Sequence, residues 1–201
     1  MELLIEGRQR AVFHVTGGVT EPAVYWLRDE ETGGVLINTP SFDAGLAETL
    51  IGSVAVIFYP SGRGARDVAR WREALGAETV AGSEEPIDGP VDIRPGRKQR
   101  LSRNFLFRPM SGRTPGTCGL YGKRDPAVLF TGPALEPGAD GWPTLVPHGD
   151  DYSWENRVFG ALGVRDARFD YCLTDSLGAD TRIGPGADTA VAANLDTALG
   201  A

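Results

Sequence analysis

Several residues that could do chemistry in this chain are cationic. Ser61, Arg63 and Arg66 follow an apolar run at residues 53–59, and Arg113 opens the segment R-T-P-G-T further along. A guanidinium keeps its positive charge and carries N–H donors but no free lone pair. Arginine therefore suits the binding of carboxylates and phosphates, and it does not ligate metal ions.

Two further polar residues, Asp175 and Ser176, follow the strand-like segment 169–173. A carboxylate can act as a general base and a hydroxyl as a nucleophile, so these two and Ser61 are candidates for catalysis without a metal. A serine nucleophile normally works with a histidine. Neither of the two histidines of the chain lies in a recognisable motif of that kind.

His148 lies close to two carboxylates, Asp150 and Asp151. One imidazole and two carboxylates can hold a single metal ion. The same aspartates also suit the N-terminal start of a helix, because acids are favoured there. We favour this capping role and a role in loop structure over a metal site. His14 alternates with apolar neighbours on a predicted strand, and we expect it to face outward or to be hydrogen-bonded.

Composition limits the classes of function. The 201 residues carry a net charge of −7, and a general nucleic-acid binder is not expected. Seven basic residues without an acid lie between residues 94 and 113, either as a solvated hairpin face or as a patch that faces an anion. The two cysteines are expected to be reduced core residues. We see neither a secretory signal nor a membrane span, and we expect a cytoplasmic protein without a membrane partner.

The pattern of apolar residues predicts a single domain over residues 1–201 with two mixed sheets and helices outside them. Strands are expected at 3–5, 11–15, 23–27, 35–37, 53–59, 79–81, 100–110, 118–121, 127–130 and 169–173. Helices are expected at 44–51, 65–75, 150–162 and 187–199, and a loop with a hairpin at 83–96. In the third helix, the inward side chains are expected to be Tyr152, Val158, Phe159 and Leu162.

Four segments together resemble the metallo-β-lactamase superfamily in their order and spacing. They are residues 34–40 (GVLINTP), 53–66 (SVAVIFYPSGRGAR), 113–117 (RTPGT) and 128–135 (VLFTGPAL). The family reads GVLIDTG, a buried strand ending in T-H-x-H-x-D-H, GHTPGS and LFTGDAL. The resemblance implies an α/β (α+β) fold, a four-layer αβ/βα sandwich with its site at the edge between two mixed sheets. Family members hold one or two metal ions there.

The resemblance places the family's metal ligands on residues that do not ligate metals. The motif H-x-H-x-D-H falls on Ser61, Arg63, Ala65 and Arg66. The histidine before T-P-G falls on Arg113, the bridging aspartate falls on Pro133, and the last histidine falls near Asp175 or Ser176. A metal site of the family type is therefore not expected, and no cofactor is expected either.

If the fold is right, Arg63, Arg66 and Arg113 converge on one pocket. Like charges at that range must splay, pair with acids such as Asp67, Asp175 or Asp180, or bind an anion. We predict a protein without hydrolase activity that binds a small anionic ligand or a protein partner, including a second copy of itself. The predicted ligand-binding residues are Ser61, Arg63, Arg66, Arg113, Asp175 and Ser176. The alternative is a hydrolase of an ester, lactone or thioester, with a single metal near His148 or with Ser61 and no metal.

Overall fold

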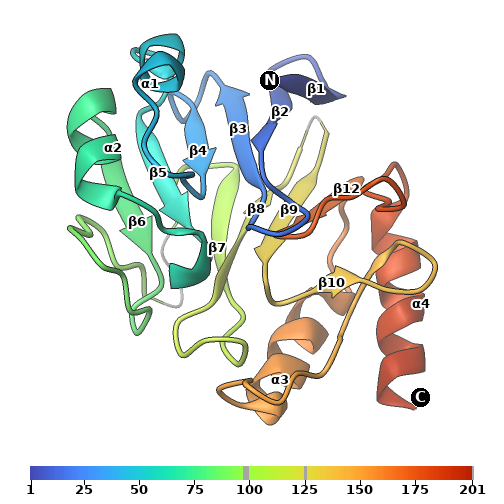
Figure 1. Cartoon of the computed structure of the whole chain (residues 1–201). Helices are drawn as coiled ribbons and strands as arrows, with labels where there is room; N and C mark the ends of the chain where they lie inside the picture. The colour runs from blue at the N-terminus through green and yellow to red at the C-terminus, as the bar shows by residue number, and fades with distance from the viewer. Residues whose placement is uncertain (97–99, 125, 201) are drawn as a thin grey trace.

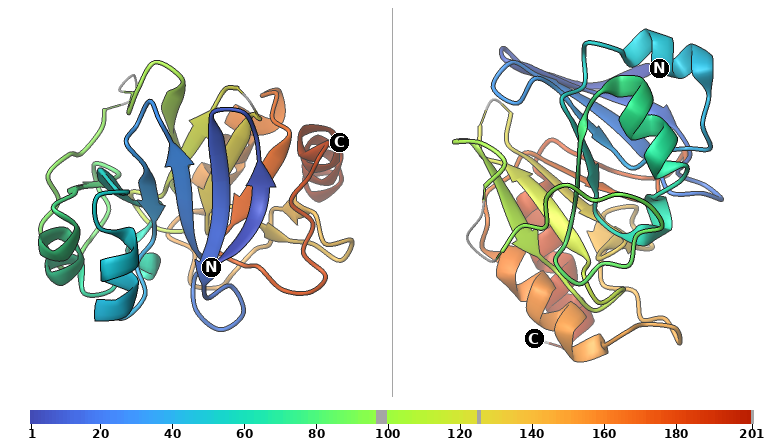
Figure 2. Two further views of the ribbon diagram at one scale, coloured as in Figure 1. Left: turned by 90° about the horizontal axis from the view of Figure 1, so that it is seen from above. Right: turned by 90° about the vertical axis from the view of Figure 1, so that its left-hand side faces the viewer.

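A computed structural model describes residues 1–96, 100–124 and 126–200 of the chain. Two β-sheets face each other, and helices cover the outer face of each (Figure 1; Figure 2, right). The helices α1 and α2 lie on one side of the molecule, and α3 and α4 lie on the other. The layers therefore follow the order helix, sheet, sheet, helix.

The first sheet has six strands in the order β1-β2-β3-β4-β5-β6. The first four strands pair antiparallel as a meander, and β4, β5 and β6 pair parallel. β5 is buried along its whole length, which explains its unbroken apolar sequence. The strands are β1 (Glu2–Glu6), β2 (Arg10–Thr16), β3 (Val24–Asp29), β4 (Val35–Ile37), β5 (Val56–Tyr59) and β6 (Glu78–Ala81).

Two helices follow the parallel strands of this sheet. α1 (Ala44–Leu50) begins where the Asp43 side chain accepts a hydrogen bond from Leu46 N. α2 (Val68–Leu75) buries Trp71 and ends at Gly76, which has the left-handed φ of 61° that terminates many helices. The indole of Trp71 donates to the carbonyl of Pro40 at 2.8 Å, so α2 is fixed to the chain that leaves β4.

The second sheet has the order β12-β9-β8-β7, with β12 and β9 parallel and the other pairs antiparallel. Its outer face is covered by α3 and α4, which carry a separate apolar cluster around Leu129, Ala161 and Val191. The strands are β7 (Phe105–Pro109), β8 (Cys118–Gly122), β9 (Val128–Gly132) and β12 (Tyr171–Thr174). The helices are α3 (Trp154–Arg165) and α4 (Ala187–Leu199), and β10 (Glu136–Pro137) and β11 (Pro143–Thr144) form a short ribbon between them in space.

The core consists of three apolar clusters, one at each boundary between layers. The central cluster joins the two sheets through residues such as Phe58, Phe107 and Phe130. A second cluster joins the first sheet to α1 and α2, and the third joins the second sheet to α3 and α4. The predicted αβ/βα sandwich is confirmed. In the described part of the chain, no helix is long and apolar enough to cross a membrane.

Several predicted elements begin later than expected: the strand expected at 53–59 begins at Val56, and the helix expected at 65–75 begins at Val68, after a separate 3-10 turn. The strand expected at 100–110 is regular only from Phe105, because residues before it form turns. The helix expected at 150–162 begins at Trp154, since Ser153 provides the cap by accepting a hydrogen bond from Asn156 N. Its buried side chains are Arg157, Ala161 and Val164, whereas Tyr152, Phe159 and Leu162 are exposed. Arg157 occupies a place on the inner face of α3 where hydrophobic periodicity expects an apolar residue. The predicted inner face therefore lay at the wrong position around the helix axis.

Candidate functional site

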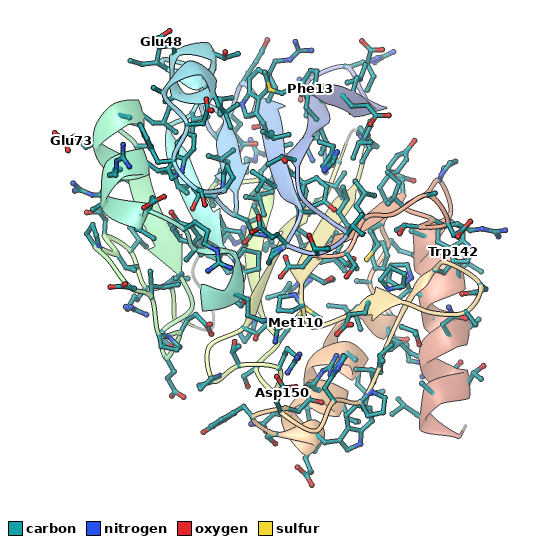
Figure 3. All side chains as sticks on the ribbon, viewed as in Figure 1. Phe13, Glu48, Glu73, Met110, Trp142 and Asp150 are labelled. Atoms are coloured by element: carbon teal, nitrogen blue, oxygen red, sulfur yellow. The ribbon has the colours of Figure 1, made fainter. Side chains whose placement is uncertain are left out.

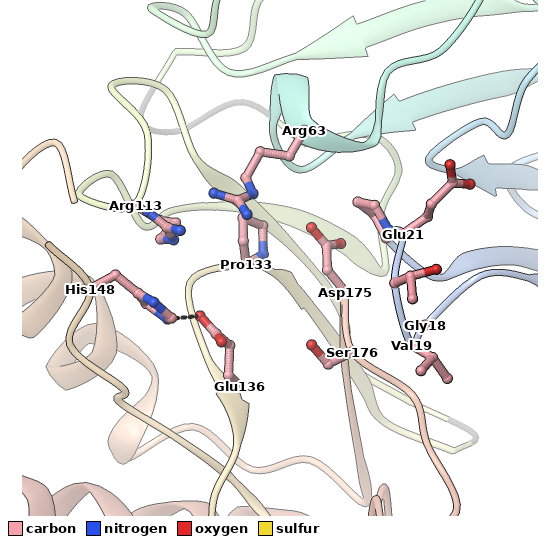
Figure 4. Close-up of a pocket in the computed structure, with 12 residues that line it drawn as sticks. Gly18, Val19, Glu21, Arg63, Arg113, Pro133, Glu136, His148, Asp175 and Ser176 are labelled. Atoms are coloured by element: carbon pink, nitrogen blue, oxygen red, sulfur yellow. Dashed lines mark hydrogen bonds and ion pairs between the residues drawn. The ribbon is translucent and has the colours of Figure 1, made fainter. Parts of the chain in front are cut away.

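A cavity of about 170 Å³ lies at the edge between the sheets, where the chain leaves β5, β9 and β12 (Figure 4). Its walls come from the β2–β3 loop, the segment after β5, the turn before β8, the ends of β9 and β12, and the loop before α3. We call this cavity the arginine pocket. Its lining residues are Gly18, Val19, Thr20, Glu21, Pro22, Arg63, Arg113, Pro133, Glu136, His148, Asp175 and Ser176.

The segment after β5 forms a short 3-10 helix, η1 (Gly62–Gly64), that carries Arg63 into the pocket. The side chain of Ser61 caps this turn by accepting a hydrogen bond from Arg63 N at 3.3 Å. Ser61 is fully buried beneath the turn and does not belong to the pocket lining. The side chain of Arg63 remains 48% exposed, so its guanidinium is accessible.

Glu85 holds η1 against the turn that carries Arg113. Its carboxylate is buried and accepts hydrogen bonds from Gly62 N at 2.5 Å, from the hydroxyl of Thr114 at 2.6 Å and from Gly116 N at 3.0 Å. These donors belong to two segments that are distant in the sequence. Glu85 therefore fixes the distance between the two arginine-bearing loops.

Asn38 supports the floor of the pocket from the end of β4. It has the left-handed φ of 63°, a conformation that asparagine tolerates better than most residues. Its amide donates to the carbonyl of Ala23 at 2.9 Å and to Asp175 Oδ1 at 2.9 Å. A Cβ on Gly64 would overlap the Asn38 side chain, so this close packing requires glycine.

Asp175 presents its carboxyl to the pocket from the end of β12 (Figure 4). Oδ1 accepts from Asn38, whereas Oδ2 is buried and has no hydrogen-bond partner among the described residues. Burial raises the pKa of Asp175 to about 7, with a smaller contribution from the charge of Glu136. The hydrogen bond from Asn38 and the charge of Arg63 act in the opposite direction.

Arg113 is buried and bound by two aspartates. Its guanidinium donates to both carboxylate oxygens of Asp150, at 2.8 and 3.2 Å, and lies 3.3 Å from Asp151. The hydrogen bonds from Arg113 hold the pKa of Asp150 below its usual value. Arg63 approaches the same carboxylate less closely, at 3.7 Å. Asp150 therefore contacts both pocket arginines.

The ion pairs continue from Asp151 along one wall of the pocket. Asp151 contacts the buried Arg157 at 2.9 Å, and Arg157 lies 3.8 Å from Glu136. Glu136 Oε1 in turn accepts a hydrogen bond from His148 Nε2 at 2.7 Å. Arg157 also donates to the carbonyls of Ala134 and Val146. We call the series Arg63, Asp150, Arg113, Asp151, Arg157, Glu136 and His148 the ion-pair chain.

The structure brings four of the six predicted ligand-binding residues to one cavity: Arg63, Arg113, Asp175 and Ser176. Ser61 lies beneath them as a cap, and Arg66 lines a smaller neighbouring recess together with Arg63. The predicted convergence of three arginines on one pocket is therefore found for Arg63 and Arg113, whereas Arg66 lies outside its lining.

The predicted acid partners of the arginines were wrong in part. The side chain of Asp67 accepts from Phe42 N, Asp175 binds Asn38, and the exposed Asp180 lies outside the pocket lining. Asp150 and Asp151 take the expected role instead. Their expected capping role is wrong, because α3 begins at Trp154 with Ser153 as its cap, but the expected loop role is found: Asp151 accepts a hydrogen bond from His148 N at 3.0 Å. His14 is hydrogen-bonded, as expected, to the carbonyl oxygen of Gly17 at 3.0 Å.

The basic run at residues 94–113 does not form one face. Arg94 donates to the carbonyls of Gly82 and Glu85, Arg108 lies over the ring of Tyr121, and Arg113 belongs to the pocket. Arg100 and Arg103 line a surface recess with Lys123 and Arg124. Arg97 and Lys98 lie outside the described residues.

Sequence reasoning missed Glu85 and Glu136, and Asn38 was not considered as part of the site. Glu85 lies in a loop rich in proline, glycine and acids, and no local pattern distinguishes it from the exposed Glu84 beside it. Asn38 could have been found, because it stands where the family sequence GVLIDTG has aspartate. Glu136 follows the motif at residues 128–135 directly, so its position near the site could also have been inferred.

Comparison with solved structures identifies the architecture. BJP-1, a subclass B3 metallo-β-lactamase of Bradyrhizobium japonicum, superposes with a TM-score of 0.65 at 15% identity, covering 100% of this chain and 92% of that one. BLEG-1, a B3 metallo-β-lactamase, gives a TM-score of 0.67 at 13% identity, covering 89% and 96%. The fold is that of the metallo-β-lactamases.

A third similar structure is a metallo-β-lactamase with a HARLDQ motif from Cronobacter sakazakii, with a TM-score of 0.61 at 12% identity over 97% of this chain and 94% of that one. No protein-family model matches this sequence, and a comparison with curated proteins finds no relative. At these identities the structural likeness establishes the fold alone.

The residues present do not fit the metal ions that this fold family holds. The corresponding positions provide a buried hydroxyl at Ser61, three guanidinium groups, an alanine, a proline and, at the last position, Asp175 or Ser176; a single carboxylate is then the one usual metal ligand among them, too few for a site of the family type. The permanent charge of Arg63 and Arg113 would also repel a cation. Within residues 1–96, 100–124 and 126–200, no three His, Cys, Asp or Glu side chains converge to hold a metal, those around His148 included.

Replacing Glu85 with alanine is expected to lower the free energy of unfolding by about 3 kcal/mol. The change leaves two buried backbone N–H groups and a threonine hydroxyl without their acceptor. Urea unfolding of Glu85→Ala and of Glu84→Ala, its exposed neighbour, measures the difference. Equal stability of the two variants would contradict the assigned role of Glu85.

Asp175 makes stability depend on pH in a defined direction. Its native pKa of about 7 lies above the value near 4 of an unfolded chain. Between about pH 4 and 7 the native state therefore holds one more proton, and the free energy of unfolding falls as the pH rises through this window. Relative to wild type, Asp175→Asn is expected to gain roughly 4 kcal/mol between pH 4 and 8.

The matched control for this pH series is Asp180→Asn, which removes an exposed carboxylate from the loop that follows β12. Urea unfolding of the three proteins at pH 4, 5, 6, 7 and 8 gives the comparison. A constant difference between Asp175→Asn and wild type across the series would show that the Asp175 carboxyl titrates normally.

Proposed function

We propose that the chain binds a small anionic ligand, a carboxylate or a phosphate ester, in the arginine pocket, and that it does not act as a metal-dependent hydrolase. The observation that carries the proposal is the half-exposed guanidinium of Arg63, which points into the cavity. Its ion pair with Asp150 is loose, with 3.7 Å between the nitrogen and the carboxylate oxygen. A charge-assisted hydrogen bond to a ligand is stronger than this loose pair.

Arg113 has a different role from the one expected for a ligand-binding arginine. Its hydrogen bonds to Asp150 and its contact with Asp151 occupy the guanidinium, and its side chain is only 5% exposed. A buried charge requires such pairing. Arg113 therefore shapes the wall of the pocket, and Arg63 is the residue that meets the ligand.

The acidic residues around the pocket repel a bound anion less than their number indicates, because most of their charges are paired or neutralised. Glu136 is paired with His148 and lies near Arg157, which compensates its charge. Burial keeps Asp175 largely protonated below its pKa of about 7, so in that range it offers a neutral carboxyl. Asp150 is directed to the two arginines.

One comparison favours the alternative, a hydrolase. The motif H-A-R-L-D-Q has arginine in its third place, as residues 61–66 have Arg63, and it belongs to a protein described as a metallo-β-lactamase. That motif retains a histidine and an aspartate in its first and fifth places. This chain has Ser61 and Ala65 there, and Ser61 is buried outside the pocket, so the hydrolase stays the second candidate.

We also propose a cytoplasmic location. Cys118 and Cys172 are both free and buried, and buried unpaired cysteines fit a reducing compartment. A protein partner or a second copy of the chain at the arginine pocket remains a proposal beside the small ligand, and size-exclusion chromatography with light scattering would detect a stable dimer.

Thermal unfolding with a panel of carboxylates and phosphate esters tests the proposed function. A ligand that binds the native state raises the melting temperature in proportion to the logarithm of its concentration. We expect such a rise for wild type and for Arg8→Ala, which removes an exposed arginine from the β1–β2 turn. Arg63→Ala is expected to lose the rise, because it removes the accessible cation.

If no member of the panel raises the melting temperature of the wild type, or if Arg63→Ala responds as wild type does, anion binding in this pocket is refuted. Activity against esters, lactones or thioesters that is lost in Ser61→Ala would establish the hydrolase instead.

A further inference from the structure

The charged groups of the arginine pocket divide into those with partners and those without. Arg113 is satisfied by Asp150, and Glu136 is satisfied by His148. Arg63 has only the 3.7 Å contact with Asp150, and Oδ2 of Asp175 has no hydrogen-bond partner among the described residues. Among the described lining residues, the pocket therefore offers a ligand one cation without a close partner, Arg63, and the unpartnered Oδ2 of Asp175, with the exposed carboxylate of Glu21 on the adjacent loop.

These two groups face each other without forming a pair. Figure 4 shows the guanidinium of Arg63 and the carboxyl of Asp175 directed into the same space beside Pro133. The charge of Arg63 lowers the pKa of Asp175, so the two are within electrostatic range. Within the described chain, Arg63 forms an ion pair with Asp150 and none with Asp175. A ligand can occupy the space between them.

The frame behind each group is fixed. Asp175 is held by the hydrogen bond from Asn38, whose other amide hydrogen is bound by the carbonyl of Ala23. Arg63 follows Gly62, whose N–H is held by the buried Glu85. The Asn38 hydrogen bond holds the Asp175 carboxyl itself, whereas the Gly62–Glu85 hydrogen bond holds only the backbone beside Arg63, whose side chain stays 48% exposed.

We propose that the ligand of the arginine pocket is amphoteric, with a carboxylate or phosphate bound by Arg63 and a protonated amine bound by Asp175. This inference rests on the proposed function and names the class of its ligand: a short amino acid or an aminoalkyl phosphate. The ammonium supplies the donor that Oδ2 lacks, and Glu21, on the adjacent loop of the lining, adds negative charge on that side.

The experiment compares ligands that differ in one group. The probes are the amino acids glycine, β-alanine and 4-aminobutanoate, the corresponding acids without the amine, and the corresponding amines without the acid. 2-Aminoethyl phosphate and ethyl phosphate provide the same comparison for phosphate. Binding is measured by isothermal titration at pH 8, where Asp175 is ionised and an aliphatic amine keeps its proton.

We expect at least one amphoteric probe to bind about tenfold more tightly than its matched acid, since a charge-assisted hydrogen bond is gained. Asp175→Asn is expected to reduce this advantage to less than about twofold, while the matched acid binds at least as tightly as before, because the variant removes a negative charge from the pocket at pH 8. The asparagine keeps an acceptor for Asn38, so the fold of the loop is retained. Glu48→Gln, an exposed change on α1 (Figure 3), is expected to bind as wild type does.

The possible failures are distinguishable. Equal binding of acids and amphoteric probes would overturn the amphoteric ligand and leave the anion site intact. Binding of neither class, or of amines alone, would overturn the anion site as well. If Asp175→Asn does not fold, the comparison of probes on the wild type and on Arg63→Ala still decides, because both inferences require Arg63 for any acid to bind.

Discussion

The candidate site depends on the pairing of one buried cation, Arg113, with Asp150 and Asp151. A guanidinium that is taken out of water requires compensation, and removing one partner of such a pair costs roughly 3 to 5 kcal/mol. The requirement ties the turn before β8 to the loop before α3, and Asp151 extends it to Arg157 in the helix itself. The loops of the pocket are thus joined by side-chain ion pairs, where the fold family uses metal ligands.

This change of chemistry leaves the backbone arrangement in place. Loops after β5, β9 and β12 still converge at the same edge of the sandwich, because the order of strands in the two sheets determines where they end. The side chains on those loops decide what is bound there. A fold can host many functions for this reason, and the metallo-β-lactamase architecture by itself does not assign a reaction to this chain.

Much of the fold could be predicted from the sequence, because buried strands such as β5, the Asp43 cap at the start of α1 and the Gly76 stop at the end of α2 leave local patterns. The error at α3 shows the limit. The charge and N–H groups of the buried Arg157 are compensated there by Asp151, Glu136 and two backbone carbonyl groups. These partners come from different loops and are not recognisable from a local sequence pattern. Local hydrophobic periodicity cannot anticipate an arginine on the inner face of a helix.

The site was predictable to a similar degree. The positions of Arg63, Arg113 and Asp175 follow from the order of motifs, whereas the assignment of partners does not. Which acid meets which arginine depends on loop conformations such as the turn at Asp150, which no residue pattern specifies. Only the three-dimensional arrangement shows that Arg113 is buried in the wall of the pocket and that Arg63 is the accessible cation.

The central claim is that side-chain ion pairs hold the site and that no metal of the family type does. The most direct test is elemental mass spectrometry of the untagged protein grown with zinc, iron and manganese, with the melting temperature measured before and after chelation. The account predicts less than about 0.1 metal equivalent per chain and an unchanged melting temperature. A stoichiometric metal that survives gel filtration, with a lower melting temperature after chelation, would contradict it.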